Sequence, residues 1–168
     1  MPTELNLNSP YKVYADDFDL SYSFTTENDV VYKLAFTDFN SLFINTSGEG
    51  IVDNVYNLLI DNVEDKFAPL DPNVRETVAE ILKEFFKNTK NTLVYTCDSV
   101  DHKQMVRYRK FNYWFDMSDF NANLVMLKNE FKDQEDSYYA SMIYHKDNPV
   151  YDILKQSYDE IVQSLNNK

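Results

Sequence analysis

Hydrophobic and polar residues alternate over residues 20–26. The apolar side of this segment consists of Leu20, Tyr22 and Phe24, and the opposite side of Ser21, Ser23 and Thr25. A period of two residues predicts a half-buried strand. The polar residues 27–29 then favour a tight turn, because Asn and Asp tolerate a positive φ. Residues 30–36 return as a second strand, so the two segments are predicted to form an antiparallel hairpin.

Apolar residues recur at helical spacing in two later segments. Asp71 is a favourable N-cap and Pro72 a favourable first helical residue. The stripe that follows them is Val74, Val78, Ile81, Leu82 and Phe85. A last helix is predicted after the cap Asn148-Pro149, with an apolar face of Val150, Ile153, Leu154, Tyr158, Ile161 and Leu165. Each of these helices is predicted to bury one side.

Short β-branched and aromatic runs separate the helices. Strands are also predicted at residues 11–14, 55–62, 92–97, 124–131 and 138–145, with a loop at 37–50. A central helix is predicted to start near Asp101, where Gln104 completes an imperfect capping box. The order β-β-β-β-α-β-α-β-β-α predicts a single α+β domain over residues 1–168, with helices on the faces of a mixed, mainly antiparallel sheet. The sheet is mixed because the central strand–helix–strand unit requires a parallel pair.

The chain is strongly acidic, with 28 Asp and Glu against 16 Lys and Arg and a formal net charge of -12. Such an excess repels phosphate backbones, so direct nucleic-acid binding is not expected. The excess suits a basic protein partner, or it only solvates the surface; composition leaves both open. No apolar run approaches the roughly 20 residues that span a bilayer, and the N-terminus lacks a secretory pattern. We therefore expect a cytoplasmic protein that does not bind membranes.

Metal-binding residue types are scarce, since the chain has one Cys and two His. A single cysteine excludes an internal disulfide, suits a reducing compartment and rules out a CxxC zinc site. The acidic pairs of the loops lack the spacing and the glycine of an EF-hand. No metal and no cofactor are therefore expected.

A basic cluster lies in the predicted central helix. Lys103, Arg107 and Lys110 are spaced i, i+4, i+7 and share one helix face, whereas Arg109 points elsewhere. The three are candidates for binding an anion or a protein partner, or they pair with the protein's own acids. A buried Arg109 that faces Asp98 would be structural, because the pair would lock the helix to the end of the preceding strand.

Cys97, Asp98 and His102 suggest a nucleophile with a base, because the N-terminus of a helix lowers the pKa of a nearby thiol. The alternative is a buried and inert Cys97, since it shares a strand face with Leu93 and Tyr95.

Three further residues have structural interpretations. His145 stands at a strand end beside a helix cap, and turn formation accounts for it. Trp114 stands between Phe111 and Phe115, which favours core packing over a ligand platform. Asp101 is interpreted in the same way, as a cap of the central helix.

The order of elements resembles the C-terminal two-thirds of the GCN5-related (GNAT) acetyltransferase fold. The residues that correspond to the motif of that family's second helix are Asp101, Gln104, Tyr108, Lys110, Asn112 and Tyr113. Tyr108 and Lys110 match the motif, and Asn112 replaces a glycine at a left-handed helix end. The resemblance implies a divergent N-acyltransferase in which Tyr108 donates a proton to the leaving thiolate of coenzyme A. The other interpretation is that the Tyr108 ring packs between helix and sheet.

The phosphate loop of that family has no counterpart here. Acetyltransferases of this type hold the pyrophosphate of coenzyme A on a glycine-rich loop before a helix, where backbone N–H groups approach the phosphates. The corresponding residues 61–76 contain no glycine, and they hold five acids against two bases. The first two helices of the family are also absent. The coenzyme site is therefore predicted to be lost.

Residues 97–115 contain a CDSxDxxQxxRxRKFxxWF-type signature, and the chain resembles a family of small uncharacterised bacterial domains that share it. This resemblance covers most of the chain and implies no known activity. We therefore predict a non-enzymatic protein-interaction module on a degenerate acetyltransferase-like scaffold. The alternatives are an acyltransferase that uses acetyl-coenzyme A, and an acidic DNA mimic or immunity-type inhibitor. The sequence leaves the oligomeric state open.

Overall fold

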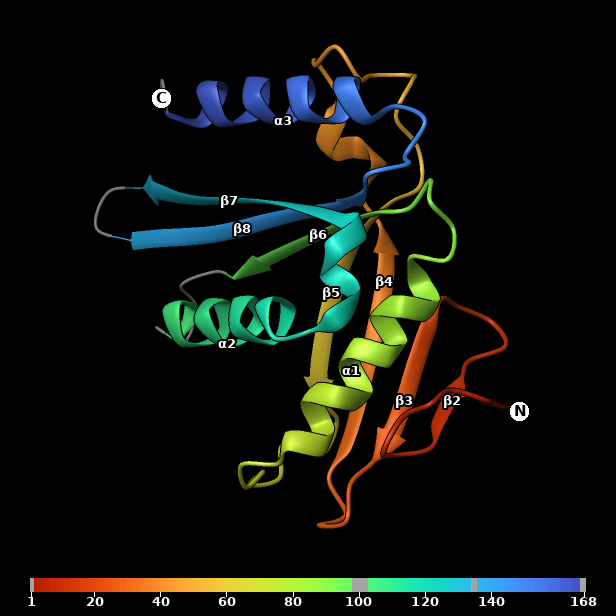
Figure 1. Ribbon diagram of the computed structural model, residues 1–168. Coiled ribbons are helices and arrows are strands. Elements are labelled where there is room, and N and C mark those ends of the chain that lie inside the picture. Colours follow the sequence, from red (N-terminus) through yellow and green to blue (C-terminus); the bar gives the residue numbers. More distant parts are fainter. Residues whose placement is uncertain (1, 98–102, 134–135, 167–168) are drawn as a thin grey trace. The chain divides into compact units, whose positions relative to one another are not determined.

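The computed structural model describes residues 2–97, 103–133 and 136–166. Over these residues the protein is an α+β fold with an eight-stranded sheet and three α-helices (Figure 1). The strands are β1 (Thr3–Leu5), β2 (Val13–Ala15), β3 (Ser21–Thr25), β4 (Val31–Asp38), β5 (Val55–Asn62), β6 (Thr92–Cys97), β7 (Leu124–Asp133) and β8 (Asp136–His145). The helices are α1 (Pro72–Phe85), α2 (Gln104–Asp116) and α3 (Tyr151–Asn166), with short 3-10 helices η1 (Asn40–Phe43) and η2 (Asp119–Asn123).

The strand order is β1-β2-β3-β4-β5-β6-β8-β7. This arrangement confirms the predicted mixed, mostly antiparallel sheet. The chain falls into two compact units. The first comprises the described residues of 1–37 and 58–87, and the second those of 38–57 and 88–168.

In the first unit, strands β1 to β4 form an antiparallel meander. The predicted hairpin is confirmed: β3 pairs with β4 from Ser21↔Ala35 to Thr25↔Val31, and Asp29 in its turn has a φ of 59°. Strand β1 is an addition to the predicted order. It pairs with β2 over residues 3–5, and three residues are too few to show a periodic pattern.

Aromatic rings pack against one another in the first unit, and one pair joins β4 to α1. Phe24 stacks on Tyr11 and Tyr32, with ring centroids 6.0 and 5.4 Å apart. Phe36 of β4 stacks on Phe85 of α1 at 4.4 Å. The predicted apolar stripe of α1 is confirmed, and its buried members are Val74, Val78, Ile81, Leu82 and Phe85. Burial of these side chains supplies the hydrophobic stabilisation of the unit.

The start of α1 is fixed as predicted. Asp71 accepts a hydrogen bond from the Asn73 N–H at 2.9 Å, and Pro72 is the first helical residue. The other carboxylate oxygen accepts the Tyr11 hydroxyl at 2.5 Å. This hydrogen bond is the main reason why the pKa of Tyr11 is raised. One carboxylate thus caps the helix and ties it to the N-terminal segment.

In the second unit, the first residues of β5 pair in parallel with β6, from Val55↔Thr92 to Asn57↔Val94. This confirms the predicted parallel pair. Strand β6 pairs antiparallel with β8, and β8 with β7. Helices α2 and α3 lie on opposite sides of these strands (Figure 1).

The core beneath α3 is closely packed around Gly48. Its buried members are Phe43, Val52, Val55, Val94, Met142, Tyr144, Leu154 and Tyr158. A Cβ atom on Gly48 would lie 2.7 Å from the Ser157 Oγ and 2.9 Å from the Val52 Cγ2. Ser157 is fully buried, and its hydroxyl has no hydrogen-bond partner among the described residues.

Several predicted boundaries are wrong in detail. Helix α2 begins at Gln104, and Lys103 occupies the N-cap position without a capping side-chain hydrogen bond. The loop 37–50 contains η1. Leu20 and Leu165, expected on apolar faces, are 36% and 42% exposed because they lie at element ends. In the described part of the chain, every helix falls short of the length and apolarity that crossing a bilayer requires.

Replacement of Asp71 should destabilise the first unit. We expect Asp71→Ala to lower the free energy of unfolding by about 1–2 kcal/mol, because the cap of α1 is lost. Asp71→Asn should cost less, since its side-chain oxygen still accepts from the Asn73 N–H. Urea denaturation followed by tyrosine fluorescence measures both. Equal midpoints for wild type and Asp71→Ala would contradict this role.

Gly48→Ala should destabilise the second unit by about 1–3 kcal/mol through overpacking. Ser157→Ala alone should be nearly neutral, because it removes a buried hydroxyl without a described partner. The double variant should recover part of the loss, since the nearest clashing atom is gone. A double-mutant cycle in urea measures the coupling, and strictly additive effects would refute the contact.

Candidate functional site

The inner face of α2 packs on β6 and β8. Phe111 is buried and stacks on Tyr95 with ring centroids 4.1 Å apart. Tyr108 is half-buried and stacks on Tyr139 at 4.8 Å with 28° between the ring planes. The Asn112 side-chain oxygen accepts the Ser141 hydroxyl at 3.4 Å. This face of the helix is therefore engaged in packing.

Cys97 lies beneath this helix and is 2% exposed. Its neighbour Tyr95 has a raised pKa, chiefly because of burial and then because of the Cys97 thiol, with which it shares a hydrogen bond. The positive charge of Arg107 lowers the pKa of Tyr95, but this effect is smaller than the effects that raise it. A thiol this buried fits the interpretation of Cys97 as a core residue.

The basic residues in and beside α2 differ in their exposure. Lys103, Arg109 and Lys110 are exposed, whereas Arg107 is half-buried. The Lys110 ammonium lies 4.9 Å from the centre of the half-buried Trp114 ring, a cation–π contact. The role of Lys103, Arg107 and Lys110 in binding an anion or a protein partner stays a prediction.

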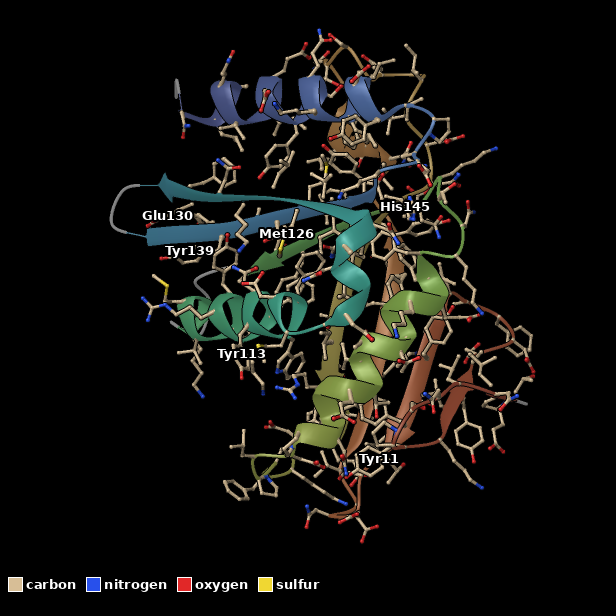
Figure 2. All side chains as sticks on the ribbon, viewed as in Figure 1. Tyr11, Tyr113, Met126, Glu130, Tyr139 and His145 are labelled. Atoms are coloured by element: carbon tan, nitrogen blue, oxygen red, sulfur yellow. The ribbon has the colours of Figure 1, made fainter. Side chains whose placement is uncertain are left out.

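The outer face of α2 carries apolar side chains. Val106 is 66% exposed, Tyr113 53% and Met117, the residue that ends the helix, 58%. With Lys110 they are spaced i, i+4, i+7, i+11, so they form one continuous line. Figure 2 shows Tyr113 on the side of α2 away from β8. We call Val106, Lys110, Tyr113 and Met117 the outer stripe of α2.

Polar side chains join α2 to the edge of the sheet. Lys128 of β7 lies 4.0 Å from Asp116 at the end of α2. Tyr139 donates a long hydrogen bond of 3.5 Å to Glu130, and both lie on the paired strands β7 and β8 (Figure 2). These contacts border the inner face of α2.

His145 has the structural surroundings that its place in the sequence indicates. It ends β8, and its Nδ1 accepts the Asp147 N–H at 2.9 Å. The next turn is closed by Asn148, whose side-chain oxygen accepts the Val150 N–H at 3.0 Å. The histidine therefore shapes the connection into α3.

Three candidate residues, Asp98, Asp101 and His102, lie outside the described residues. The predicted Arg109–Asp98 pair and the nucleophile–base arrangement thus stay predictions. Within the described ranges, no group of three or more His, Cys, Asp or Glu side chains is placed to hold a metal ion.

A depression of about 510 Å³ lies on the first unit, lined by residues 4–7 and 9–12. A single segment forms this lining. Ligand sites usually combine polar groups that converge from several elements, so this depression has few of the features of a binding site.

The sequence interpretation missed a second exposed surface. Residues 63–71 connect β5 to α1, and we call them the β5–α1 segment. Phe67 is 88% exposed and Leu70 is 96% exposed. Exposure of two large apolar side chains so close in the chain is unusual. The available signal was an apolar FAPL run within an acidic stretch.

A family model described as "Family of unknown function (DUF6169)" matches residues 70–160. The matched residues begin at the end of the β5–α1 segment, contain α1, β6, α2, β7 and β8, and end within α3. None of the curated proteins compared with the chain matches it. Because the model matches more than half of the 168 residues, the chain belongs to this family of unknown function.

Proposed function

We propose that this protein is a non-enzymatic protein-interaction module that recognises its partner through the outer stripe of α2. The scaffold would be acetyltransferase-like in its order of elements, with the coenzyme site lost. The glycine-free, acidic residues 61–76 support that loss.

The exposed apolar line on α2 is the observation that carries the proposal. Val106, Tyr113 and Met117 are each more than half exposed, on a helix whose opposite face is already packed. Exposed apolar residues in a line are typical of helix surfaces that bind another protein. Tyr and Met are also enriched in interfaces, because Tyr offers a large rigid surface and Met adapts its shape.

The partner's chemistry follows from the side chains beside this line. Lys103, Arg109 and Lys110 are exposed next to the apolar residues. A complementary surface would present apolar side chains flanked by carboxylates. The cations would thereby fix the orientation of the partner, while the apolar contacts would supply most of the affinity.

The candidate catalytic groups fit packing better than chemistry. The Tyr108 ring is stacked on Tyr139, and Cys97 is almost fully buried. A general acid must come within hydrogen-bond reach of the leaving group. These positions favour the interaction module over the acyltransferase.

Polar substitution of the outer stripe should weaken partner binding. We expect Val106→Ser/Met117→Ser to reduce recovery of the partner at least about tenfold in a quantitative pull-down, because the buried apolar area is lost. The matched control is Ile44→Ser, which removes an apolar side chain that is 54% exposed on η1's flank. Thermal unfolding should be nearly unchanged in both variants, since surface substitutions usually cost little. Equal recovery by wild type and stripe variant would refute the site.

Substitution of Tyr108 separates the module from the acyltransferase. If the ring only packs, Tyr108→Phe should change the free energy of unfolding by less than about 0.5 kcal/mol, whereas Tyr108→Ala should cost about 2 kcal/mol. Urea denaturation measures both.

Binding of acetyl-coenzyme A would favour the acyltransferase over the interaction module. Acetyl-coenzyme A at about a hundred times its Kd would stabilise the fold by roughly 2.7 kcal/mol and raise the Tm by several degrees. Such a rise, with turnover that Tyr108→Phe abolishes, would contradict the proposed function. We expect no rise at millimolar concentration.

A further inference from the structure

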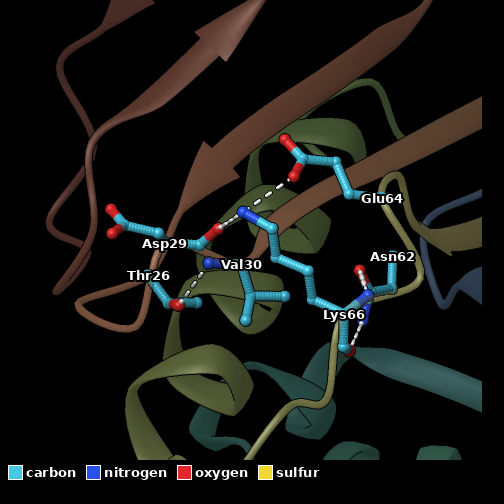
Figure 3. Close-up of polar contacts among 6 residues, drawn as sticks. All are labelled: Thr26, Asp29, Val30, Asn62, Glu64 and Lys66. Atoms are coloured by element: carbon cyan, nitrogen blue, oxygen red, sulfur yellow. Dashed lines mark hydrogen bonds and ion pairs between the residues drawn. The ribbon is translucent and has the colours of Figure 1, made fainter.

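The β5–α1 segment begins with a polar turn. The Asn62 side chain donates to the Lys66 carbonyl at 2.7 Å and accepts the Lys66 N–H at 3.3 Å (Figure 3). The Asp65 N–H donates to the Asn62 carbonyl at 3.0 Å, and Asp65 has a φ of 50°. These contacts close residues 62–66 into a defined turn.

Lys66 ties this turn to the β3–β4 hairpin. Its ammonium pairs with Glu64 at 2.7 Å and donates to the Asp29 carbonyl at 3.1 Å (Figure 3). Thr26 supports the hairpin turn in the same way, because its hydroxyl accepts the Val30 N–H at 3.2 Å. The single cation of the segment is thus engaged within the protein.

The apolar residues that follow are presented at the surface. Ala68 and Pro69 line a shallow depression with Tyr32 and Val74 of the same unit, so the backbone of the segment lies against the body of that unit. The side chains of Phe67 and Leu70 are nevertheless 88% and 96% exposed. An anchored backbone with projecting apolar side chains is pre-organised for insertion into another surface.

The surroundings of these two side chains are acidic. Asp61, Glu64 and Asp65 are all exposed on the chain just before Phe67, and Asp29 is exposed on the attached hairpin turn. The whole chain carries a net charge of -12. The apolar pair therefore lies in a negative field, which attracts basic surfaces and repels acidic ones.

We propose that Phe67 and Leu70 insert into an apolar groove, bordered by Lys and Arg side chains, on a basic protein partner. We infer a basic partner because its charge is complementary to the acids around Phe67 and Leu70. The surface is distinct from the outer stripe of α2, and residues 61–69 lie outside the part of the chain that matches the family model. The proposal for the β5–α1 segment can therefore be tested independently of the proposal for α2.

A membrane fits this surface less well. Exposed Phe and Leu side chains can enter a bilayer, but the surface potential of anionic lipids repels the adjacent carboxylates. A protein groove with a basic border satisfies both the apolar side chains and the acids.

Site-specific photo-crosslinking tests the proposal. The photoreactive amino acid p-benzoylphenylalanine is placed at position 67, and the full chain is irradiated in an extract of the organism that encodes it. The matched control carries the same amino acid at position 18, because Phe18 is 94% exposed and also flanked by acids. We expect one protein with a basic surface to be crosslinked from position 67 and not from position 18.

Titration of that purified protein then measures how much the apolar pair and the neighbouring acids contribute to the Kd. Phe67→Ser/Leu70→Ser should raise the Kd at least about tenfold, and Phe18→Ser should leave it unchanged. Asp61→Asn/Asp65→Asn should raise the Kd about threefold and flatten its salt dependence; Asn tolerates the positive φ of Asp65. Asp53→Asn/Asp159→Asn removes the same charge from the other unit and should have a smaller effect.

Several outcomes would overturn the proposal. Three crosslinking results would do so: equal crosslinking from positions 18 and 67, no crosslink from position 67, or a crosslink to a second copy of the chain. A Kd that is the same for the wild type, Phe67→Ser/Leu70→Ser and Asp61→Asn/Asp65→Asn would also do so. Phosphatidylcholine vesicles that bind the wild type but not Phe67→Ser/Leu70→Ser would identify a membrane anchor instead. If Val106→Ser/Met117→Ser lost binding to this protein while Phe67→Ser/Leu70→Ser kept it, the outer stripe of α2 would be the binding surface and the β5–α1 segment would not.

Discussion

Strand β6 is buried on both of its faces, and the second unit is organised by the need to cover both. Leu93 and Tyr95 point toward α2, where Phe111 stacks on Tyr95. Val94 points the other way, into the core with Leu154 of α3. A strand with a parallel neighbour is usually covered in this way, because helices lie on both sides of the sheet. The inner face of helix α2 is therefore used for packing, and the apolar residues of its outer stripe stay exposed.

Local signals in the sequence predicted most elements correctly. The cap at Asp71 and the apolar stripe after it specify α1 within about one turn of chain, so no distant contact was needed to find the helix. The parallel pair followed from chain connectivity alone. One strand and one helix boundary were not predicted, for physical reasons. Strand β1 has only three residues and is defined by its pairing with β2. Helix α2 was predicted, but it begins at Gln104 without the local cap that the sequence favours.

The candidate sites were less predictable because exposure is a property of packing. Periodicity placed Tyr108 and Cys97 with other apolar residues, which agrees with their stacked and buried positions. It could not say that Val106 would face solvent, since an apolar residue on a helix usually indicates the core. The exposure of Phe67 was even harder to predict. It belongs to no repeating pattern, and its exposure depends on how Lys66 anchors the preceding turn to the hairpin.

The acidity of the chain and its exposed apolar side chains are two parts of one arrangement. Apolar surfaces promote association of a protein with its own copies. A net charge of -12 opposes this association, because every copy carries the same sign. Repulsion between like-charged copies would therefore oppose self-association through the exposed Phe67 and Leu70. Around Phe67 and Leu70 the same acids would favour the basic partner that we propose for this segment, since a basic surface gains electrostatically when it approaches them. In this arrangement charge would determine which partner is bound, and the exposed apolar side chains would supply most of the affinity.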